Sequence, residues 1–350
     1  MRKSKALARD NAIRRALEFI YRTACDDTIF AEWGHDLVGC FHCIASTSKD
    51  AEFAARARKF GQERARVWRR ANASVPKDAD ANAIANLVFG SVASNYFQID
   101  DKALKPQIIK AAPQFGGEDY YWFDAAAEPP PRNVPIDCDC GAYNPRGRKS
   151  CSSCKKSLKI YSRYALYVDA LTRTYFAERL GVTLGARYRD VLKWVPVLRP
   201  YPGRENGANP DFFDAIYAVT HIVYTLNGYS LYKLKPGWLP DEYEFLRANL
   251  VEAIAIQDPD AMGEFLDCLK SFGLTEDHPL IRTGTDYLLE TQNQDGSWGD
   301  ADAEDIYDRY HPTWTAIDGL REYAWRGERL HYPGFMPLLE RWNKKPARKM

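Results

Sequence analysis

The sequence predicts an all-α protein, an (α/α)6 toroid of six helical hairpins with a small inserted zinc-binding element that has four cysteine ligands. Three observations predict this fold. An aromatic residue recurs at a nearly constant period, charged helical segments alternate with apolar ones, and two tight cysteine pairs interrupt the pattern. A closed ring covers its inner helices on both sides, which explains why one helix of each pair is apolar nearly all round.

The last hairpin is the template for the others. A charged amphipathic segment, 281–291, leads into the polar stretch Gln292-Asn-Gln-Asp-Gly-Ser-Trp298, and an apolar segment follows. Gly296 predicts a tight turn because glycine adopts left-handed conformations at little cost, and Trp298 can fold back over that turn. We expect Pro312 at the first position of the second helix, where its missing N–H costs nothing. The whole stretch is therefore an αα-hairpin.

Five further aromatic residues precede Trp314 on nearly the same period, which indicates an internal repeat. Four of the five steps are 48 to 50 residues long, and the fifth, of 78 residues, contains the cysteine-rich interruption. The six marker aromatics are Phe41, Phe89, Tyr167, Tyr217, Phe265 and Trp314. The charged segments expected as outer helices are 11–22, 51–70, 102–112, 186–197, 240–256 and 279–291. The alternative is coincidence, because aromatic residues make up 13% of the chain.

The repeat also predicts the domain organisation. Residues 1–128 are the first hairpins of the toroid, 129–157 a zinc-ribbon-like insertion, 158–332 the remaining hairpins, and 333–350 a frayed C-terminal tail. A chain of 350 residues is long for one core, but a closed ring grows around its circumference.

Composition and charge exclude several classes of protein. The formal net charge is +1, so no overall charge attracts nucleic acid or a membrane surface. No window approaches 18 consecutive apolar residues and no secretory signal is visible, so we expect no membrane span. With eight cysteines and no export signal, we expect thiols and metal ligands instead of disulfides, in a cytoplasmic protein.

The stretch 129–157 contains the most specific motif of the chain. Two short-spaced pairs, Cys138-Asp-Cys140 and Cys151-Ser-Ser-Cys154, flank a loop rich in Gly, Asn and Arg. Four thiolates from two tight turns suit a closed tetrahedral zinc site, which is structural because no coordination position stays open. Zinc would fold an insertion too small for a core of its own. The alternative is a redox or disulfide pair.

From Cys140 onward the spacing Cys-x3-Asn-x6-Cys-x2-Cys resembles that of Ran-binding-type zinc fingers, with Asn144 as the asparagine. The match is incomplete, because one residue separates the first two cysteines and no tryptophan stands just upstream. Members of that family bind ubiquitin or single-stranded RNA, a property that we do not carry over to this chain.

The corner Gln292-x3-Gly296-x-Trp298 resembles the QW motif, Gln-x(2–5)-Gly-x-Trp, of squalene and terpene cyclases and of protein prenyltransferase β subunits. The resemblance implies that the corner ties an outer helix to the next inner helix of an α/α toroid. It covers about the last 200 residues and supports the fold more than the reaction.

Two motifs of these families can be compared with this chain. The prenyltransferase zinc site uses Asp-x-Cys and a later Tyr-His; Asp260 and His311 match, but Met262 stands in place of the cysteine. A thioether is a poor zinc ligand beside a thiolate, so we expect neither that site nor protein prenylation. Asp300-Ala-Asp302-Ala also departs from the Asp-x-Asp-Asp acid motif of squalene cyclases.

Candidate catalytic residues follow from the repeat. Positions three before and four after each marker aromatic share one face of a helix, and polar side chains gather there on the last helices. The candidates are His311, Asp214, Asp260, His221 and Asp318. Carboxylates beside His311 favour its protonated form, which suits a general acid. The alternative is that His221 is a hydrogen-bonded core histidine and Asp318 a satisfied buried carboxylate.

Other candidate sites are weaker. His35, Cys40, His42 and Cys43 share one predicted helix with Asp36 and could hold a second metal, as could His221 with His311. Small buried cysteines that pack between helices explain the first group more simply. The basic run within 51–72 is most simply a solvated outer face.

The sequence thus predicts an enzyme that acts on an apolar or aromatic small molecule in the central cavity of the toroid. The alternative is a non-catalytic toroid that binds a peptide or protein and carries a structural zinc element.

Overall fold

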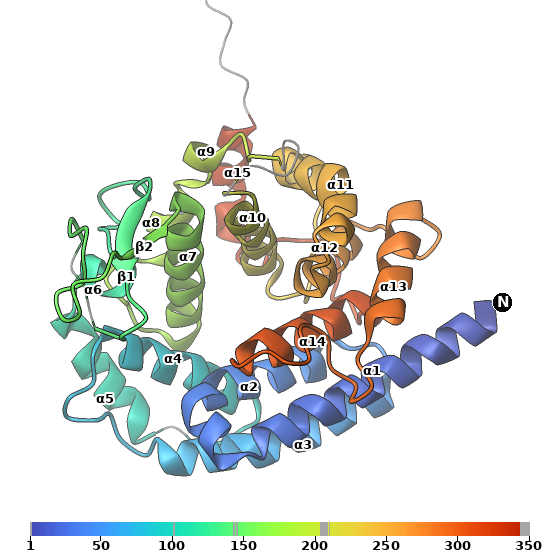
Figure 1. Cartoon of the computed structure of the whole chain (residues 1–350), viewed down its shortest axis with the longest axis horizontal. Coiled ribbons are helices and arrows are strands. Elements are labelled where there is room, and N and C mark those ends of the chain that lie inside the picture. The colour runs from blue at the N-terminus through green and yellow to red at the C-terminus, as the bar shows by residue number, and fades with distance from the viewer. Residues whose placement is uncertain are drawn as a thin grey trace, which may run out of the picture. The chain divides into compact units, whose positions relative to one another are not determined.

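The computed structural model describes residues 2–100, 102–142, 144, 146–203, 209 and 211–343, and most of this chain is helical (Figure 1). The chain divides into two compact units, one within residues 1–71, 93–100 and 223–350, the other within 72–92 and 101–222. Helices α4 (Ala81–Tyr96) and α10 (Phe212–Asn227) contribute residues to both units. The predicted all-α class is confirmed, and closure into a toroid stays a prediction.

The first unit is built mainly from long helices. Those that lie wholly within it are α1 (Arg2–Ala24), α2 (Asp27–Thr47), α3 (Ala51–Ala71), α11 (Pro240–Ala255), α12 (Pro259–Ser271), α13 (Pro279–Thr291), α14 (Tyr307–Leu320) and α15 (Met336–Trp342). The tail predicted as frayed is in fact helical over α15, because Leu339 is buried there. The basic end of that tail, 344–350, lies outside the described residues.

Helices α12 and α14 pack side by side at very close range. A Cβ atom on Gly263 of α12 would lie 2.3 Å from the carbonyl oxygen of Thr315. A Cβ on Gly319 of α14 would lie 2.9 Å from the Cα of Gly263. Only glycine fits at both positions, so the two helices approach backbone to backbone, and this contact fixes the register of the side chains on both helices.

The corner between α13 and α14 confirms the predicted fold-back of Trp298. This side chain is fully buried, and its Nε1–H donates to the carbonyl oxygen of Leu288 in α13 at 2.8 Å. The backbone N–H of Trp298 donates to Thr313 Oγ1 in α14 at 2.9 Å. Gln292 Nε2 donates to the carbonyl oxygen of Ala12, so the corner joins three helices.

Helix α1 binds the same corner from outside. Arg15 Nη2 donates to the carbonyl oxygens of Asn293 and Gln294 at 2.9 and 2.8 Å. Gly296 has a φ of +94°, and a Cβ there would lie 2.9 Å from the carbonyl oxygen of Arg15. The left-handed turn and the close approach of α1 therefore both require glycine.

The predicted start of α14 is wrong. Asp305 Oδ1 accepts a hydrogen bond from the N–H of Tyr307 at 2.9 Å, and the helix begins there. His311 and Pro312 consequently lie inside the helix, not at its first position. Pro312 removes the bond to the carbonyl of Asp308. Gly299 packs against that carbonyl, since a Cβ on Gly299 would lie 2.2 Å from the Asp308 oxygen.

The second unit has shorter helices and the described strands. Its elements are α5 (Leu104–Ala111), α6 (Gly117–Tyr121), β1 (Val134–Asp137), β2 (Lys159–Tyr161), α7 (Arg163–Leu180), α8 (Tyr188–Leu192) and α9 (Val195–Leu198). Strands β1 and β2 pair antiparallel, with Val134 opposite Tyr161. The helix expected over 186–197 is broken into α8 and α9, because Pro196 cannot continue a helix from residue 192.

All six marker aromatics lie on α-helices, in the order α2, α4, α7, α10, α12 and α14. The charged segments expected between them coincide with α1, α3, α5, α11 and α13, apart from the broken segment at α8 and α9. Within the described residues, no helix is both long enough and apolar enough to cross a membrane.

Candidate functional site

Two groups of side chains within the described residues could hold a metal ion, one in each unit. The first is the predicted set of four cysteines. Cys138 follows β1 directly, and Cys151 and Cys154 lie in the loop before β2. The carbonyl oxygen of Cys138 accepts from Gly141 N at 2.9 Å, and that of Cys151 accepts from Lys155 N at 3.2 Å. Each cysteine pair therefore lies on a tight turn closed by its own backbone.

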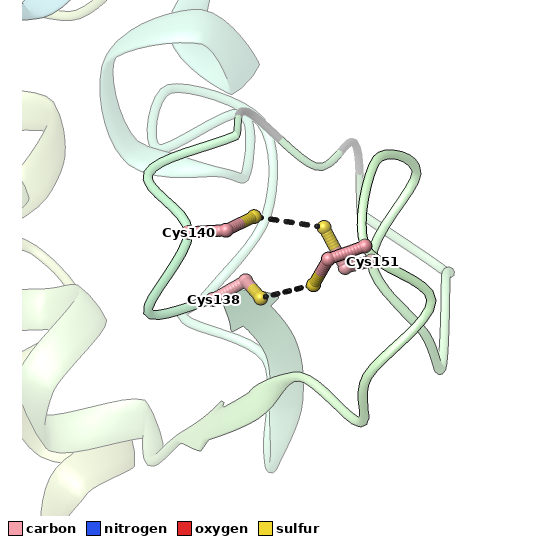
Figure 2. Close-up of side chains that lie close together, drawn as sticks. Cys138, Cys140 and Cys151 are labelled. Carbon is pink, nitrogen blue, oxygen red and sulfur yellow. Dashed lines mark hydrogen bonds between the residues drawn. The ribbon is translucent and has the colours of Figure 1, made fainter.

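The four sulfur atoms converge on one point. Figure 2 shows Cys138 and Cys140 on one side of the loop, with their sulfurs directed at those of the second pair. The Cys138 and Cys154 sulfurs are 3.3 Å apart, the Cys140 and Cys151 sulfurs are 3.4 Å apart, and all four lie within 4.8 Å of one another. Zn–S bonds of ~2.3 Å at tetrahedral angles require S–S separations of ~3.8 Å, which lies within this range. All four are free thiols, so the disulfide alternative is not what the structure contains.

The surroundings of Cys151 favour its thiolate form. A hydrogen bond from the backbone N–H of Cys154 outweighs burial and, with a second bond from Ser153 N, lowers the pKa of Cys151 to about 6. Asn144 supports the same turn, since its Oδ1 accepts from Ser152 N at 2.8 Å and its Nδ2 lies 3.8 Å from the Cys151 sulfur. Cys138 shifts in the opposite direction, because a backbone hydrogen bond from Cys140, which lowers its pKa, is outweighed by its side-chain hydrogen bond with Cys154 and by burial, which raise it. The thiolate form is therefore favoured at Cys151 in particular.

The second group consists of Asp260 and Glu264 on α12 and His311 on α14. Asp260 and Glu264 are four residues apart, so they lie on one face of α12. The close packing of α12 against α14 brings His311 to that face. The ligand atoms of the three residues lie within 4.8 Å of one another. The sequence predicted Asp260 and His311 but missed Glu264, although its spacing from Asp260 was a usable signal.

Asp260 and His311 form a buried ion pair. His311 Nδ1 lies 3.1 Å from both carboxylate oxygens of Asp260, and the two side chains are only 13% and 12% exposed. Burial opposes protonation of His311, but the charge and hydrogen bond of Asp260, with weaker contributions from Asp36 and Glu264, raise its pKa to about 9. The direction of this pKa shift agrees with the predicted preference for the protonated form.

Neighbouring residues hold this pair in place. Asp258 caps α12, and its Oδ1 accepts from the backbone N–H groups of Asp260 and Ala261 at 2.9 and 3.0 Å. Burial and the charge of Asp260 raise the pKa of Asp258 to about 6. On the other side, the Tyr310 hydroxyl donates to Asp36 Oδ2 of α2 at 2.8 Å.

Aromatic rings surround His311. The Tyr307 ring stacks on the imidazole with centroids 4.8 Å apart, and Trp314 meets it edge-on at 5.8 Å. Trp33 of α2 lies 5.0 Å from Tyr307. A cationic imidazole stacked on the face of Tyr307 is stabilised electrostatically, and the rings offer apolar surface to a ligand.

After the first turn of α14, its partly exposed residues form one strip. Between Tyr310 and Arg321 only His311, Trp314 and Asp318 are not buried, and these residues are three and four positions apart. They are the marker aromatic and the two positions that the repeat singled out. Everything else in this stretch packs against protein, so any ligand that reaches α14 meets these three side chains.

Helix α10 also has three partly exposed residues at this spacing, but here the aspartate comes first and the histidine last. Between residues 214 and 227 only Asp214, Tyr217 and His221 are not buried. Asp214 accepts from Ser162 Oγ at 2.6 Å, and burial raises its pKa against that bond. His221 Nδ1 lies 2.9 Å from the carbonyl oxygen of Tyr217. These residues belong to the second unit, so their predicted meeting with His311 and Asp260 stays a prediction.

The remaining candidate residues are those of α2, and Cys40, His42 and Cys43 among them lie in the buried core. Cys40 is fully buried and Cys43 6% exposed, and the residues His35, Cys40, His42 and Cys43 are in neither of the two metal-competent groups. The imidazole of His42 lies 4.4 Å from the Tyr96 ring, as expected for an interior side chain. The simpler interpretation of these cysteines, core packing, agrees with their burial.

No protein-family model matches the sequence, and comparison with curated proteins finds no match either.

Proposed function

We propose that the protein is an enzyme that acts on an apolar or aromatic small molecule and that Asp260 and His311 are its reacting groups. The observation that carries the proposal is the ion pair at 3.1 Å between two largely buried side chains, one of which, His311, belongs to the partly exposed strip of α14. Burying two ionisable groups is costly, and perturbed pairs of this kind concentrate at functional sites.

In the main form of this proposal His311 is a general acid. A pKa of about 9 keeps the imidazole protonated at neutral pH, and Asp260 orients the ring through Nδ1. Trp314 and Tyr307 provide the apolar surface against which the ligand would rest. The proton would pass from the imidazole to a basic atom of the substrate, and the site would be reprotonated from solvent.

Glu264 favours a second candidate, a metal-dependent enzyme. Two carboxylates and one imidazole within 4.8 Å are an oxygen-rich ligand set that leaves coordination positions open for water and substrate. Met262, at the position of the family cysteine, is fully buried and outside this group. With a bound divalent cation His311 would be neutral, so the two forms exclude each other and can be separated by experiment.

The finer structural predictions belong to the same proposal. We propose that the helical pairs close into an (α/α)6 toroid like that of terpene cyclases and prenyltransferases, which the QW-like corner supports. We propose also that the four cysteines hold a structural zinc ion, supported by the convergence of their sulfurs. The rival function is a non-catalytic toroid that binds a peptide or protein.

The test begins with native mass spectrometry of the purified protein, to identify a co-purifying small molecule, followed by a turnover assay with that molecule. His311→Ala should then reduce turnover by ~10²–10⁴, the usual range for general acid–base catalysis. His278→Asn is the matched control, because His278 caps α13 and asparagine can cap it as well. Turnover of His311→Ala within about threefold of wild type would remove the acid role.

The metal-dependent candidate is tested separately, by measuring the metal content of the protein. If metal is bound at this site, Glu264→Gln should lower the second equivalent of metal per chain without changing the metal held by the cysteines. If the second equivalent is absent in the wild type, the acid form stands and the metal-dependent form is wrong. Binding of a peptide with no turnover of any co-purifying molecule would favour the non-catalytic toroid.

A further inference from the structure

The two cysteine turns of the loop 138–158 are held in shape by the backbone. Each turn ends at a residue in the left-handed conformation, Gly141 with a φ of +71° after the first pair and Lys155 with a φ of +65° after the second. In the second turn, the N–H of Cys151 also donates to the carbonyl oxygen of Lys156 at 2.8 Å. The position of each cysteine pair is therefore set by its own turn.

The two short sulfur–sulfur contacts of the loop run between these turns, not within them. Cys138 of the first turn meets Cys154 of the second at 3.3 Å, and Cys140 meets Cys151 at 3.4 Å (Figure 2). A disulfide bond is ~2.05 Å long, so each contact becomes a bond when the two sulfurs approach by a further ~1.3 Å. The positions of the thiols thus favour two cross-links that join the turns.

Each of these contacts pairs an exposed cysteine with a buried one. Cys140 and Cys154 are exposed, whereas Cys138 is 5% exposed and Cys151 is fully buried. A dissolved oxidant reaches the exposed sulfur of each pair first. The buried sulfur lies in contact with it, which is the arrangement of an accessible cysteine and its resolving cysteine.

We propose that the four cysteines are a redox-modification site, at which a peroxide converts the loop into a form closed by two disulfides, Cys138–Cys154 and Cys140–Cys151. The inference goes beyond the proposed enzyme, because it involves neither α12 nor α14. It concerns the same sulfurs as the proposed zinc site, but the pairing follows from their positions with or without an ion. A sulfur in a disulfide no longer offers the thiolate that zinc requires, so oxidation and metal binding exclude each other.

Each disulfide consumes one molecule of hydrogen peroxide. The sulfur of Cys140 attacks the peroxide, an S–O bond forms, the O–O bond breaks, and the departing hydroxide takes the thiol proton to become water. The sulfur of Cys151 then attacks this sulfenic sulfur. An S–S bond forms, the S–O bond breaks, and the second oxygen leaves as water with the proton of the Cys151 thiol. Cys154 and Cys138 react in the same way, and each pair supplies the two electrons that reduce one peroxide.

The two disulfides would keep the loop closed after the metal has been lost. The bond between residues 140 and 151 lies inside the loop that the bond between 138 and 154 closes. Cross-links of this kind stabilise a folded loop by restricting its unfolded chain. The loop accordingly has two closed forms, one metal-bound and one disulfide-bonded, and opens when it is both reduced and metal-free.

Peptide mapping of the wild-type protein tests the pairing. The full chain is treated with hydrogen peroxide, alkylated, and digested with trypsin without reduction. Trypsin cuts after Arg148 and Lys149, so the two cysteine pairs separate unless a disulfide joins the turns. We expect the two peptides to stay joined, with a mass lower by four hydrogen atoms.

Fragmentation of the joined peptides assigns each bond. Cleavage at Asp139 and between Ser152 and Ser153 should show Cys138 bound to Cys154 and Cys140 bound to Cys151. Separate peptides, any other pairing, or sulfinic and sulfonic acids in place of disulfides would overturn the proposal.

Cys25 provides the control, because it is an exposed free thiol outside the loop. Cys25→Ser should form the same two cross-links at the same rate as the wild type. Loss of the cross-links in that variant would assign them to exchange with Cys25, and the proposal would be wrong.

Metal release and hydrogen exchange test the two closed forms. Peroxide should release the metal of the loop to a chromophoric chelator, and dithiothreitol with added zinc should restore it. Amides of residues 138–158 should stay protected in the oxidised protein and lose protection in the reduced, chelator-treated protein. Loss of protection in the oxidised protein would show that disulfides do not close the loop. A purified protein without metal would remove the proposed zinc, but peptide mapping would still decide the pairing, so the two failures are distinguishable.

Discussion

The two groups that could hold a metal are assembled in opposite ways. The four cysteines come from seventeen consecutive residues, 138–154, on two turns next to a two-stranded sheet. Asp260, Glu264 and His311 come from two helices, and the ion pair joins residues 51 positions apart. The first group depends on local chain geometry, and the second depends on how α12 and α14 pack.

This difference in assembly predicts which of the two groups needs a bound metal ion in order to keep its structure. The apolar cluster of the cysteine loop consists of Cys138, Cys151 and Leu158, with Ala142 packed against it. So small a cluster cannot offset the loss of chain entropy, so we expect metal binding to supply the folding free energy of the loop. The helix pair is already fixed by the contact of Gly263 with Thr315, so we expect Asp260, Glu264 and His311 to keep their positions without an ion.

The largest expected effect is therefore on the cysteine loop. Cys151→Ser should release the metal and unfold the loop around residues 138–158, because structural zinc supplies ~10–16 kcal/mol in small zinc domains. Metal analysis and hydrogen exchange measure the two consequences. The helices of the first unit should keep their protection from exchange.

Cys25→Ser is the matched control, since Cys25 is an exposed free thiol outside both groups. Full metal content in Cys151→Ser would rule out the four-cysteine site. Collapse of the helical signal as a whole would show instead that the loop is not an independent element.

The next largest effect is on the helix pair. Asp260→Asn leaves the shape of the side chain but removes the partner of His311, and breaking a buried ion pair typically costs ~3–5 kcal/mol. Chemical denaturation at neutral pH measures the loss in the free energy of unfolding. Asp318→Asn tests specificity, because it removes a different carboxylate of the same unit and should leave the pKa of His311 near its wild-type value.

The two groups also differ in how much of each could be predicted from the sequence. The convergence of Cys138, Cys140, Cys151 and Cys154 was predictable, because residues on adjacent turns are brought together by their spacing alone. The marker positions on α14 and α10 were predictable as well, because a helix repeats its faces every three to four residues. In the structure, those positions are the ones that are not buried within 310–321 of α14 and 214–227 of α10.

Other features were not encoded locally. Glu264 and His311 lie on two helices that meet only after folding, so their proximity could not be assigned from spacing. The start of α14 was misplaced because Pro312 was taken as a first-turn residue. In the structure, the helix begins earlier, at Tyr307 with Ile306 as its N-cap, and Gly299 packs against the carbonyl of Asp308, four residues before Pro312.

A smaller effect concerns pH. The folded-state pKa of His311, about 9, lies above its ordinary value of 6.5. The pair therefore contributes its full stability below about pH 6.5, and this contribution, up to ~3 kcal/mol, is lost as pH rises toward 9. Denaturation midpoints measured across this window should fall in the wild type and stay flatter in His311→Gln. An equally steep fall in His311→Gln would assign the dependence to other groups.

The smallest expected effect concerns Asn144 and the metal affinity of the cysteine loop. Asn144 is 1% exposed although the loop around it is exposed, and its Nδ2 donates to the carbonyl oxygen of Ala142 at 2.7 Å. Together with the bond from Ser152 N to its Oδ1, it joins the turn after Cys140 to the turn of Cys151. Asn144→Ala should keep all four thiolates but lower metal affinity by about 10–100-fold, the usual cost of losing a residue that orients ligands.

Competition with a chromophoric chelator measures that affinity. Asn293→Ala is the control, because Asn293 bonds Ser297 in the helical corner of the first unit and should leave metal affinity unchanged. An unchanged affinity in Asn144→Ala would mean that the two cysteine turns are aligned by the metal itself. In that case no protein contact would position the cysteines before the ion binds. The contrast with the α12–α14 site, whose side chains are positioned by helix packing, would then be larger.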